Sequence, residues 1–178
     1  AKIGGKGLFV KEIEEALLAG RADVAIHSAK DLPARIAAGL SLVAVPERAD
    51  PRDALVTRRE GLRLETLPQG ARVGTGSTRR TSQLLALRPD LEVVGLRGNV
   101  PTRLARLDTS DLDAVVLACA GLDRLRLGAR IDERIAPECM LPAVCQGMLA
   151  LEARAGEALG RELAALDNMQ NAFRSVAS

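Results

Sequence analysis

The sequence predicts an α/β fold made of two lobes, with mostly parallel sheets and a cleft between the lobes. Short runs rich in β-branched residues alternate with amphipathic stretches along the 178-residue chain, as in β-α-β units. Residues 47–53 interrupt this alternation with a proline and five charges, which is typical of a connection between lobes. The chain is long enough for two small hydrophobic cores.

The composition is that of a folded, soluble protein, and it narrows the choice of partners. Hydrophobic residues make up 47% and charged residues 27% of the chain, so disorder is not expected. Phe9 and Phe173 are the only aromatic residues, which argues against nucleic-acid binding through base stacking. No run of roughly 18 apolar residues occurs, and we therefore expect neither a transmembrane helix nor a membrane partner.

The cysteines and the single histidine, His27, argue against a disulfide framework and against a zinc site. The three cysteines form an odd set without C-x-x-C spacing. We therefore expect no metal ion and a reducing compartment, the cytoplasm. The cysteines are Cys119, Cys139 and Cys145.

The first lobe is expected to combine residues 1–46 with residues 147–166. A glycine-rich cationic segment precedes an amphipathic helix that ends before Gly20. β-branched runs predict the strands, and the spacing of apolar residues predicts the helices. The predicted helices are 8–18, 34–38 and 156–166, and the predicted strands are 23–26, 40–45 and 147–152.

The second lobe is expected over 54–140, between a hinge at 47–53 and a return hinge at 141–146. Strands and helices alternate in it, and open α/β sheets bind ligands at the carboxyl ends of their strands. The predicted strands are 54–57, 71–75, 91–96 and 114–118, and the predicted helices are 77–87, 99–107 and 121–125.

The segment 25–33 carries a dense group of polar side chains in the first lobe. His27, Ser28, Lys30 and Asp31 directly follow a strand and precede a proline that bars further pairing. A solvated surface turn is the plain alternative, because isolated charge pairs usually have no measurable effect. We expect His27 to be packed or hydrogen-bonded, since adjacent strand residues face opposite sides and do not form a Ser-His-Asp triad.

Three successive strand ends of the second lobe offer arginines. Backbone N–H groups at a helix start, hydroxyl groups and guanidinium groups together form an anion-binding cup. Capped helices with solvated arginines are the alternative, but the repetition favours a ligand that carries several carboxylates. The candidate residues are Thr75, Ser77, Arg79 and Arg80 after the first of these strands, Arg97, Gly98 and Arg103 after the second, and Arg124 after the third.

Asp31 is the one carboxylate in the motifs expected at these edges, and it is therefore the candidate for proton handling. Two other classes of protein remain open at this point: a non-catalytic module that binds an anion between two lobes, and a nucleic-acid-binding protein. A pure anion binder gains nothing from a carboxylate among its cations. The nucleic-acid class lacks an aromatic platform for bases.

Seven motifs in order along the chain resemble those of the porphobilinogen deaminase (hydroxymethylbilane synthase) family. The match runs from Gly4 to about Glu152 and is specific because the motifs are long and ordered. The motifs are G-G-K-G-L-F-V-K-E-I-E, A-I-H-S-A-K-D-L-P, E-R-A-D-P-R-D-A, V-G-T-G-S-T-R-R, L-R-G-N-V-P-T-R-L, A-G-L-D-R-L and L-P-A-V-C-Q-G.

The resemblance implies two lobes like those of periplasmic binding proteins, together with a third, small domain. It implies a transferase of tetrapyrrole (haem and chlorophyll) biosynthesis that condenses porphobilinogen head to tail and releases ammonia at each step. The family builds the product on a dipyrromethane cofactor attached to a cysteine. A cytoplasmic monomer with porphobilinogen as its small-molecule substrate is expected.

The resemblance also implies roles for individual residues. Asp31 matches the catalytic carboxylate, which interacts with pyrrole nitrogens and assists deamination and coupling. Segment 2–7 matches a mobile segment that can cover the site, and Lys6, Phe9 and Gln146 match positions near the substrate end of the cleft. The expected partners of the acetate and propionate side chains are Lys30, Thr75, Ser77, Arg79, Arg80, Arg97, Arg103 and Arg124.

The sequence departs from the family pattern at three points. The Gly-Gly-Cys motif that carries the cofactor is absent, Cys145 replaces the usual glycine beside Gln146, and the family's first strand is missing. We therefore expect a fragment that lacks the start of the enzyme and the third domain, with 167–178 leading toward that domain. Such a fragment is expected to be inactive alone, with the cofactor cysteine outside it.

Overall fold

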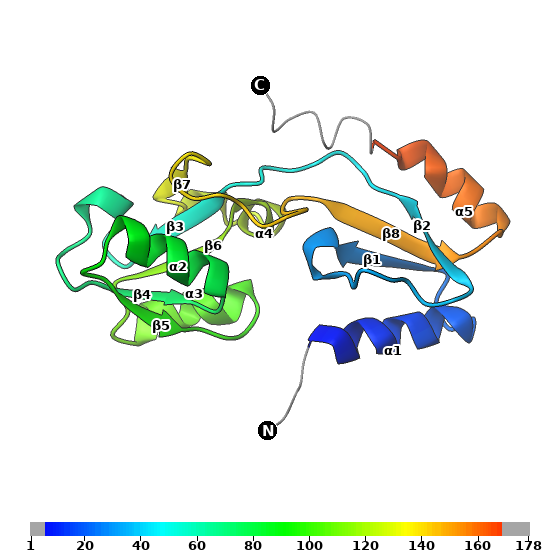
Figure 1. Ribbon diagram of the computed structural model, residues 1–178, viewed down its shortest axis with the longest axis horizontal. Helices are drawn as coiled ribbons and strands as arrows, with labels where there is room; N and C mark the ends of the chain where they lie inside the picture. The colour runs from blue at the N-terminus through cyan, green and yellow to red at the C-terminus, as the bar shows by residue number, and fades with distance from the viewer. Residues whose placement is uncertain (1–5, 169–178) are drawn as a thin grey trace. The chain divides into compact units, whose positions relative to one another are not determined.

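The computed structural model describes residues 6–168, with side chains from residue 10 onward. It divides the chain into two compact units, Ala1–Ala49 with Met148–Ser178 and Asp50–Gly147 (Figure 1). The segments predicted as hinges, 47–53 and 141–146, therefore fall mostly within the second unit. Among the described residues, no helix is both long enough and apolar enough to cross a membrane.

The first unit is built on a three-stranded sheet with helix α1 packed against it (Figure 1). Its elements are α1 (Lys6–Leu18), β1 (Val24–Ser28), β2 (Leu40–Ala44), β8 (Leu149–Arg154) and α5 (Ala158–Leu163). The strand order is β1-β8-β2, and both pairings are antiparallel. Leu17 of α1 packs with Ala25 and Leu40 in a small core, which holds the helix on the sheet.

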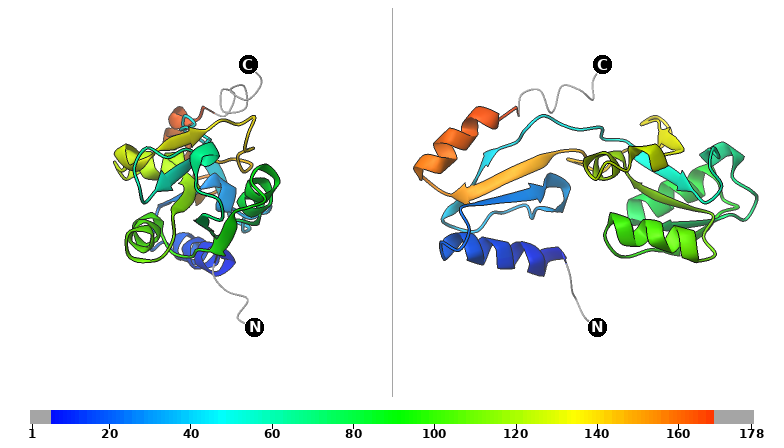
Figure 2. Two further views of the ribbon diagram at one scale, coloured as in Figure 1. Left: turned by 90° about the vertical axis from the view of Figure 1, so that its left-hand side faces the viewer. Right: turned by 180° about the vertical axis from the view of Figure 1, so that it is seen from behind.

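The second unit holds a five-stranded sheet with helices on both of its faces (Figure 2). Its elements are β3 (Asp53–Thr57), β4 (Arg72–Thr75), α2 (Thr78–Leu87), β5 (Glu92–Gly95), α3 (Val100–Thr109), β6 (Ala114–Ala118), α4 (Cys119–Arg124) and β7 (Glu133–Ile135). The strand order is β5-β4-β6-β3-β7. Leu84 of α2 packs in the core on one face, and Leu104 of α3 packs in the core on the other.

β3 lies inside this sheet and is buried along its whole length. Leu55 belongs to the core on one face, whereas Ala54 and Val56 belong to the core on the other. A strand buried on both faces has consecutive apolar residues rather than an alternating pattern. Asp53, the first residue of this strand, is a charged group directly before the apolar residues Ala54, Leu55 and Val56.

The predicted α/β class is confirmed, and all seven predicted strands form within two residues of their expected bounds. The helix predicted at 34–38 is absent, since five residues are too few for a stable helix and Ile36 and Ala37 pack against the first core instead. A 3-10 turn, Ala29–Asp31, forms just before this segment. The short strand β7 was not predicted, because three residues show no periodicity.

The strand pairing differs from the mostly parallel arrangement that the sequence predicts. β8 arrives from the second unit and inserts between β1 and β2, so it runs antiparallel to both of them. In the second unit β4 is parallel to β5 and β6, but β3 is antiparallel to β6 and β7. Neighbouring strands can be parallel only if the chain crosses back over the sheet between them. The chain makes no such crossover into the pairs that β8 and β3 form.

Candidate functional site

The carboxyl ends of β4, β5 and β6 lie at one edge of the sheet in the second unit. These strands are neighbours, and β4 pairs parallel with the other two. β3 runs in the opposite direction, so its first residue, Asp53, pairs with Ala118 at the end of β6. The antiparallel strand therefore brings a carboxylate to the edge where the parallel strands end.

The turn between β4 and α2 holds the first group of predicted residues. The Ser77 hydroxyl caps α2 by accepting a hydrogen bond from the Arg80 backbone N–H at 3.5 Å, and Thr75 Oγ1 accepts from the Ser77 N–H at 3.3 Å. Gly76 lets the turn approach β5, because a Cβ there would lie 2.5 Å from the Leu96 carbonyl oxygen. The first N–H groups of a helix have no intrahelical acceptor, so this turn supplies donors at the sheet edge.

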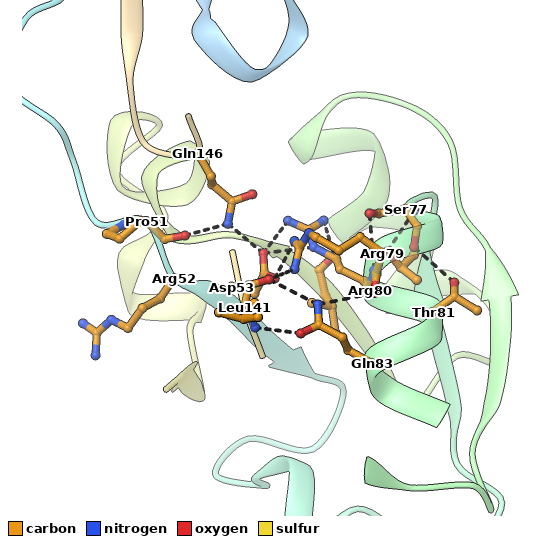
Figure 3. Close-up of polar contacts among 12 residues, drawn as sticks. Pro51, Arg52, Asp53, Ser77, Arg79, Arg80, Thr81, Gln83, Leu141 and Gln146 are labelled. Carbon is orange, nitrogen blue, oxygen red and sulfur yellow. Dashed lines mark hydrogen bonds and ion pairs between the residues drawn. The ribbon is translucent and has the colours of Figure 1, made fainter. Parts of the chain in front are cut away.

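Asp53 is the centre of a buried charge cluster at this edge (Figure 3). Its side chain is fully buried, and Oδ1 accepts from Arg80 Nε at 3.0 Å and Arg80 Nη2 at 2.7 Å. Oδ1 also accepts from Gln146 Nε2 at 2.8 Å, and Oδ2 accepts from Arg79 Nη2 at 2.7 Å. Two guanidinium groups of α2 thus share one carboxylate of β3.

The two arginines of this cluster differ in what they leave for a ligand. Arg80 is only 5% exposed, and its third nitrogen, Nη1, donates to the Val116 carbonyl oxygen at 3.0 Å. Arg79 donates through Nη1 to the Leu141 carbonyl oxygen, but its buried Nε has no hydrogen-bond acceptor among the described residues. The Arg79 side chain is 25% exposed, so Arg79, unlike Arg80, can be reached by an external acceptor.

Gln146 and Leu141 tie the end of the second unit to the same cluster. Gln146 is buried, and its Nε2 also donates to the Pro51 carbonyl oxygen at 2.7 Å. The Leu141 N–H donates to Gln83 Oε1 at 2.7 Å, and Gln83 Nε2 donates back to the Leu141 carbonyl oxygen at 3.2 Å. The backbone turns just before Gln146, where Cys145 has a φ of 58°.

The turn between β5 and α3 carries the second group. Arg97 is exposed, and Gly98 has a φ of 118°, where a Cβ would lie 2.9 Å from Thr102 Cγ2. Asn99 caps α3 by accepting from the Thr102 N–H at 2.9 Å. Arg103 Nε donates to the Gly98 carbonyl oxygen at 2.7 Å, which turns this side chain back toward the start of its helix.

Arg124, at the end of α4, is the third predicted group. Its Nη2 donates to the Gly147 carbonyl oxygen at 2.7 Å. Burial lowers the pKa of Arg124 below its usual range, yet a guanidinium group stays charged at neutral pH. The side chain therefore adds positive charge while it holds the last residue of the second unit.

The predicted residues of the first unit lie after β1. Lys30 and Asp31 form the 3-10 turn Ala29–Asp31, where Lys30 is exposed and Asp31 is partly buried. His27 is buried, with its Nε2 2.8 Å from Glu152 Oε2, which confirms the expectation of a hydrogen-bonded histidine. The side chains of Lys6 and Phe9, and the start of segment 2–7, lie outside the described residues.

The structure groups most of the predicted residues on the second unit and places two of them on the first. The first unit carries Lys30 and Asp31. The second unit carries Thr75, Ser77, Arg79, Arg80, Arg97, Gly98, Arg103, Arg124 and Gln146. Asp31 is not the only carboxylate beside these motifs, because Asp53, predicted to belong to a hinge, pairs with the arginines. The available signal was its position at the start of an uninterrupted apolar run.

Comparison with known proteins assigns the chain to a family. The family model described as porphobilinogen deaminase, dipyromethane cofactor binding domain, matches residues 1–162. The chain belongs to the porphobilinogen deaminase family. Porphobilinogen deaminases from Syntrophotalea carbinolica and Roseiflexus sp. are 55% and 58% identical to it over 165 and 167 residues, 93% of this chain. These matches cover 52% and 55% of the relatives, so the chain spans about half of their length.

Solved structures with a similar fold include a periplasmic substrate-binding protein and a methionine-binding protein. A periplasmic substrate-binding protein of an ABC transporter from Coxiella burnetii matches with a TM-score of 0.56 and 12% identity, over 92% of this chain and 78% of that one. The methionine-binding protein MetQ matches with a TM-score of 0.53 and 14% identity, over 91% and 76%. At these identities the likeness shows the fold alone, and it confirms the predicted relationship of the fold to periplasmic binding proteins.

The hydrogen-bond donors of the second unit fit a group that carries several carboxylates, such as the dipyrromethane cofactor of this family. The buried Arg79 Nε–H has no acceptor among the described residues, and the exposed Arg97 lies at the next strand end of the same edge. Cys119 is a poor candidate for covalent attachment, because burial raises the pKa of its thiol to about 11. The structure thus supports a binding role for this unit rather than an attachment role for that cysteine.

Proposed function

We propose that the complete protein to which this chain belongs is a hydroxymethylbilane synthase, a transferase of tetrapyrrole biosynthesis. The observation that carries the proposal is the sheet edge of the second unit, in a chain of the porphobilinogen deaminase family. At this edge, arginines from three helices follow three neighbouring strands. In each coupling, the amino group of one porphobilinogen would leave as ammonia while its methylene carbon bonds to the free carbon of another pyrrole, which loses a proton.

The arginines and hydroxyl groups of the second unit would bind the acetate and propionate side chains of the pyrrole rings. Guanidinium groups match carboxylates in geometry as well as in charge. Arg97 and Arg103 flank one turn and Arg79 flanks the next, so a chain of pyrroles with regularly spaced carboxylates has several anchoring points. Thr75 and Ser77 contribute hydroxyl groups to these turns, and Gly98 allows the positive φ that the turn after β5 requires.

The dipyrromethane group, when bound, supplies the pyrrole carbon to which porphobilinogen is joined. The residues that would hold it are the donors of the second unit, with Arg79 as the partly exposed arginine of the pair bound to Asp53. The cysteine to which it is attached is expected outside this chain. Lys30 of the first unit is a further candidate partner for a carboxylate.

Asp31 is the residue that we propose for proton handling. A carboxylate accepts hydrogen bonds from pyrrole N–H groups and stabilises the positive charge that develops as ammonia leaves. The 3-10 turn after β1 fixes its backbone, and the side chain is partly buried. We further propose that the protein acts as a cytoplasmic monomer on porphobilinogen and has no nucleic-acid or membrane partner.

Replacement of Asp31 by asparagine in the complete protein tests this function. Asp31→Asn keeps the size of the side chain and removes its charge, so we expect porphobilinogen consumption to fall by about 100-fold or more. Consumption and ammonia release would be measured together, and circular dichroism would show that the fold is intact.

Asp23→Asn is the matched control for this experiment. Asp23 lies just before β1 and pairs with Arg154 at 2.8 Å, but its side chain is 72% exposed. We expect its replacement to leave consumption near the wild-type rate. Consumption by Asp31→Asn at the rate of this control would contradict the catalytic assignment.

A further inference from the structure

We propose that Asp53 is a positioning residue that fixes both arginines of α2 and sets the charge of their cluster, so that the cluster accepts one ligand carboxylate at Arg79. The proposal rests on the proposed function only for the identity of that ligand. Its evidence is the buried cluster of Asp53, Arg79, Arg80 and Gln146 (Figure 3).

The hydrogen bonds of Arg79 and Arg80 differ, and this difference indicates different roles for the two side chains. All three guanidinium nitrogens of Arg80 have protein acceptors, two bonds going to Asp53 and one to Val116. Arg79 shares only Nη2 with Asp53, at 2.7 Å, and its buried Nε–H has no acceptor among residues 10–168. Because the Arg79 side chain is 25% exposed and that of Arg80 only 6%, Arg80 acts through Asp53, whereas Arg79 is the member of the pair that touches the ligand.

The count of charges points to a single ligand carboxylate. Two guanidinium groups and one carboxylate give the cluster a net charge of +1. Buried charges are stable only when they are paired, so one anionic group completes the cluster and a second would leave it negative. Without Asp53 the charge would be +2, and the two guanidinium groups would repel each other.

The topology explains why Asp53 can hold this place. Its backbone is fixed by antiparallel pairing with β6 on one side and β7 on the other. Gln146 Nε2 bridges Asp53 and the Pro51 carbonyl oxygen, which fixes the carboxylate from a third direction. The arginines thus gain a rigid partner, and a rigid donor loses less entropy when it binds.

Asp53→Asn in the complete protein separates positioning from simple stability. The variant would be produced in cells without a supply of porphobilinogen and then incubated with it, and its intact mass would report covalent cofactor. We expect loading to fall by roughly tenfold or more, because Arg79 and Arg80 lose their common anchor. We also expect inorganic phosphate to raise the thermal midpoint of the apo variant more than that of the wild type, because the +2 cluster attracts an added anion.

Asp132→Asn is the matched control within the same unit. Asp132 accepts from the Thr57 N–H at 2.7 Å, the Thr57 hydroxyl at 2.9 Å and the Gly61 N–H at 2.7 Å. Its loss removes hydrogen bonds and stability as well, but it leaves the arginines of α2 untouched. We expect normal loading and the wild-type response to phosphate, with sodium chloride at equal ionic strength as the reference.

The proposal is overturned if either quantity, loading or phosphate response, stays at its wild-type value in folded Asp53→Asn. If that variant does not fold, Asp53→Asn combined with Arg80→Met decides, because this pair of changes restores a charge of +1. Its phosphate response should equal that of the wild type, and an excess or a loss would overturn the proposal. A wild-type protein that gains no cofactor mass would contradict the proposed function instead, and the phosphate comparison would still test Asp53.

Discussion

Individual atoms decide which residues of the second unit can serve a ligand. Two adjacent arginines, Arg79 and Arg80, look equivalent in the sequence, yet each guanidinium nitrogen of Arg80 has a protein acceptor, whereas Arg79 Nε has none among the described residues. The difference comes from Asp53 and from the Val116 carbonyl oxygen, neither of which is a neighbour in sequence. A residue-level prediction from motif alone cannot separate the two roles.

Cys145 is a second residue whose role depends on its backbone. Its φ of 58° lies in the left-handed region, which costs a residue with a Cβ about 1–2 kcal/mol and which glycine adopts freely. Replacement of Cys145 by glycine would remove this cost. Part of the benefit is lost, because glycine also gives the unfolded chain more conformational freedom. We expect Cys145→Gly to raise the free energy of unfolding by about 0.5–1 kcal/mol.

Urea unfolding of the complete protein would measure this change. Cys139→Gly is the control, because Cys139 is exposed and is not among the described residues with positive φ. There the added freedom of the unfolded chain is uncompensated, and stability should fall slightly. Equal effects of the two substitutions would show that the backbone at Cys145 is not strained.

The pairing of β1 with β8 shows how an element is held by a polar contact in its interior. His27 and Glu152 are both buried, and their side chains meet at 2.8 Å across the two strands. Glu152 Oε1 is buried as well and has no hydrogen-bond partner among the described residues. Among the described residues, His27 is therefore the one side chain that forms a hydrogen bond with Glu152.

Removal of His27 alone should be strongly destabilising. His27→Ala leaves a buried carboxylate without its partner, which typically costs about 3–5 kcal/mol. His27→Leu combined with Glu152→Met removes both polar groups at similar volume, and we expect it to recover most of the loss.

Thermal midpoints of the complete protein and its variants would show this recovery. Glu15→Gln is the control, because Glu15 makes only an exposed pair with Lys11 at 3.9 Å and should matter by about 0.5 kcal/mol or less. A double variant as unstable as His27→Ala would contradict the pairing argument.

At the scale of the whole molecule, the chain crosses between its two units near Asp50 and near Gly147. Asp50 accepts hydrogen bonds from Arg52 and from Arg134, and Arg134 also pairs with Asp123 of α4. The entry into the second unit is therefore tied to β7 and α4 by a charge network. Gln146 and Arg124 tie the exit to β3 and α4.

The network at Asp50 makes the free energy of unfolding depend on pH. Burial acts to raise the pKa of Asp50, but the hydrogen bonds from Arg52 and Arg134 outweigh it and lower the pKa from 3.8 to about 2. Because the folded pKa lies below the unfolded one, the contribution is present above pH 4 or so and is lost as the pH falls through about 2.

We expect Asp50→Asn to cost about 1 kcal/mol at pH 5–7 and progressively less below pH 4. Unfolding free energies of the wild-type protein and of Asp50→Asn, measured between pH 7 and pH 2, would test this expectation. Asp108→Asn, which removes an exposed pair with Arg130, is the control and should have a small effect throughout. A cost at Asp50 that stays constant down to pH 2 would contradict the assignment.

The sequence by itself determined the fold class, the positions of most strands and helices, and the family. Periodicity and β-branched runs reflect which side chains face a core, and this is local information. The turns that carry Ser77, Gly98 and Arg124 could be placed for the same reason, since each directly follows a strand. The hydrogen-bonded state of His27 was also within reach, because its strand position excluded the catalytic alternative.

Only the tertiary structure decided the pairing direction of the strands and, with it, the partner of the arginines. A parallel β3 would have started at the opposite edge of the sheet and carried Asp53 away from the arginines of α2. Antiparallel pairing places Asp53 beside Ala118, within reach of Arg79 and Arg80. Strand direction depends on contacts between distant segments, and no local pattern of residues encodes it.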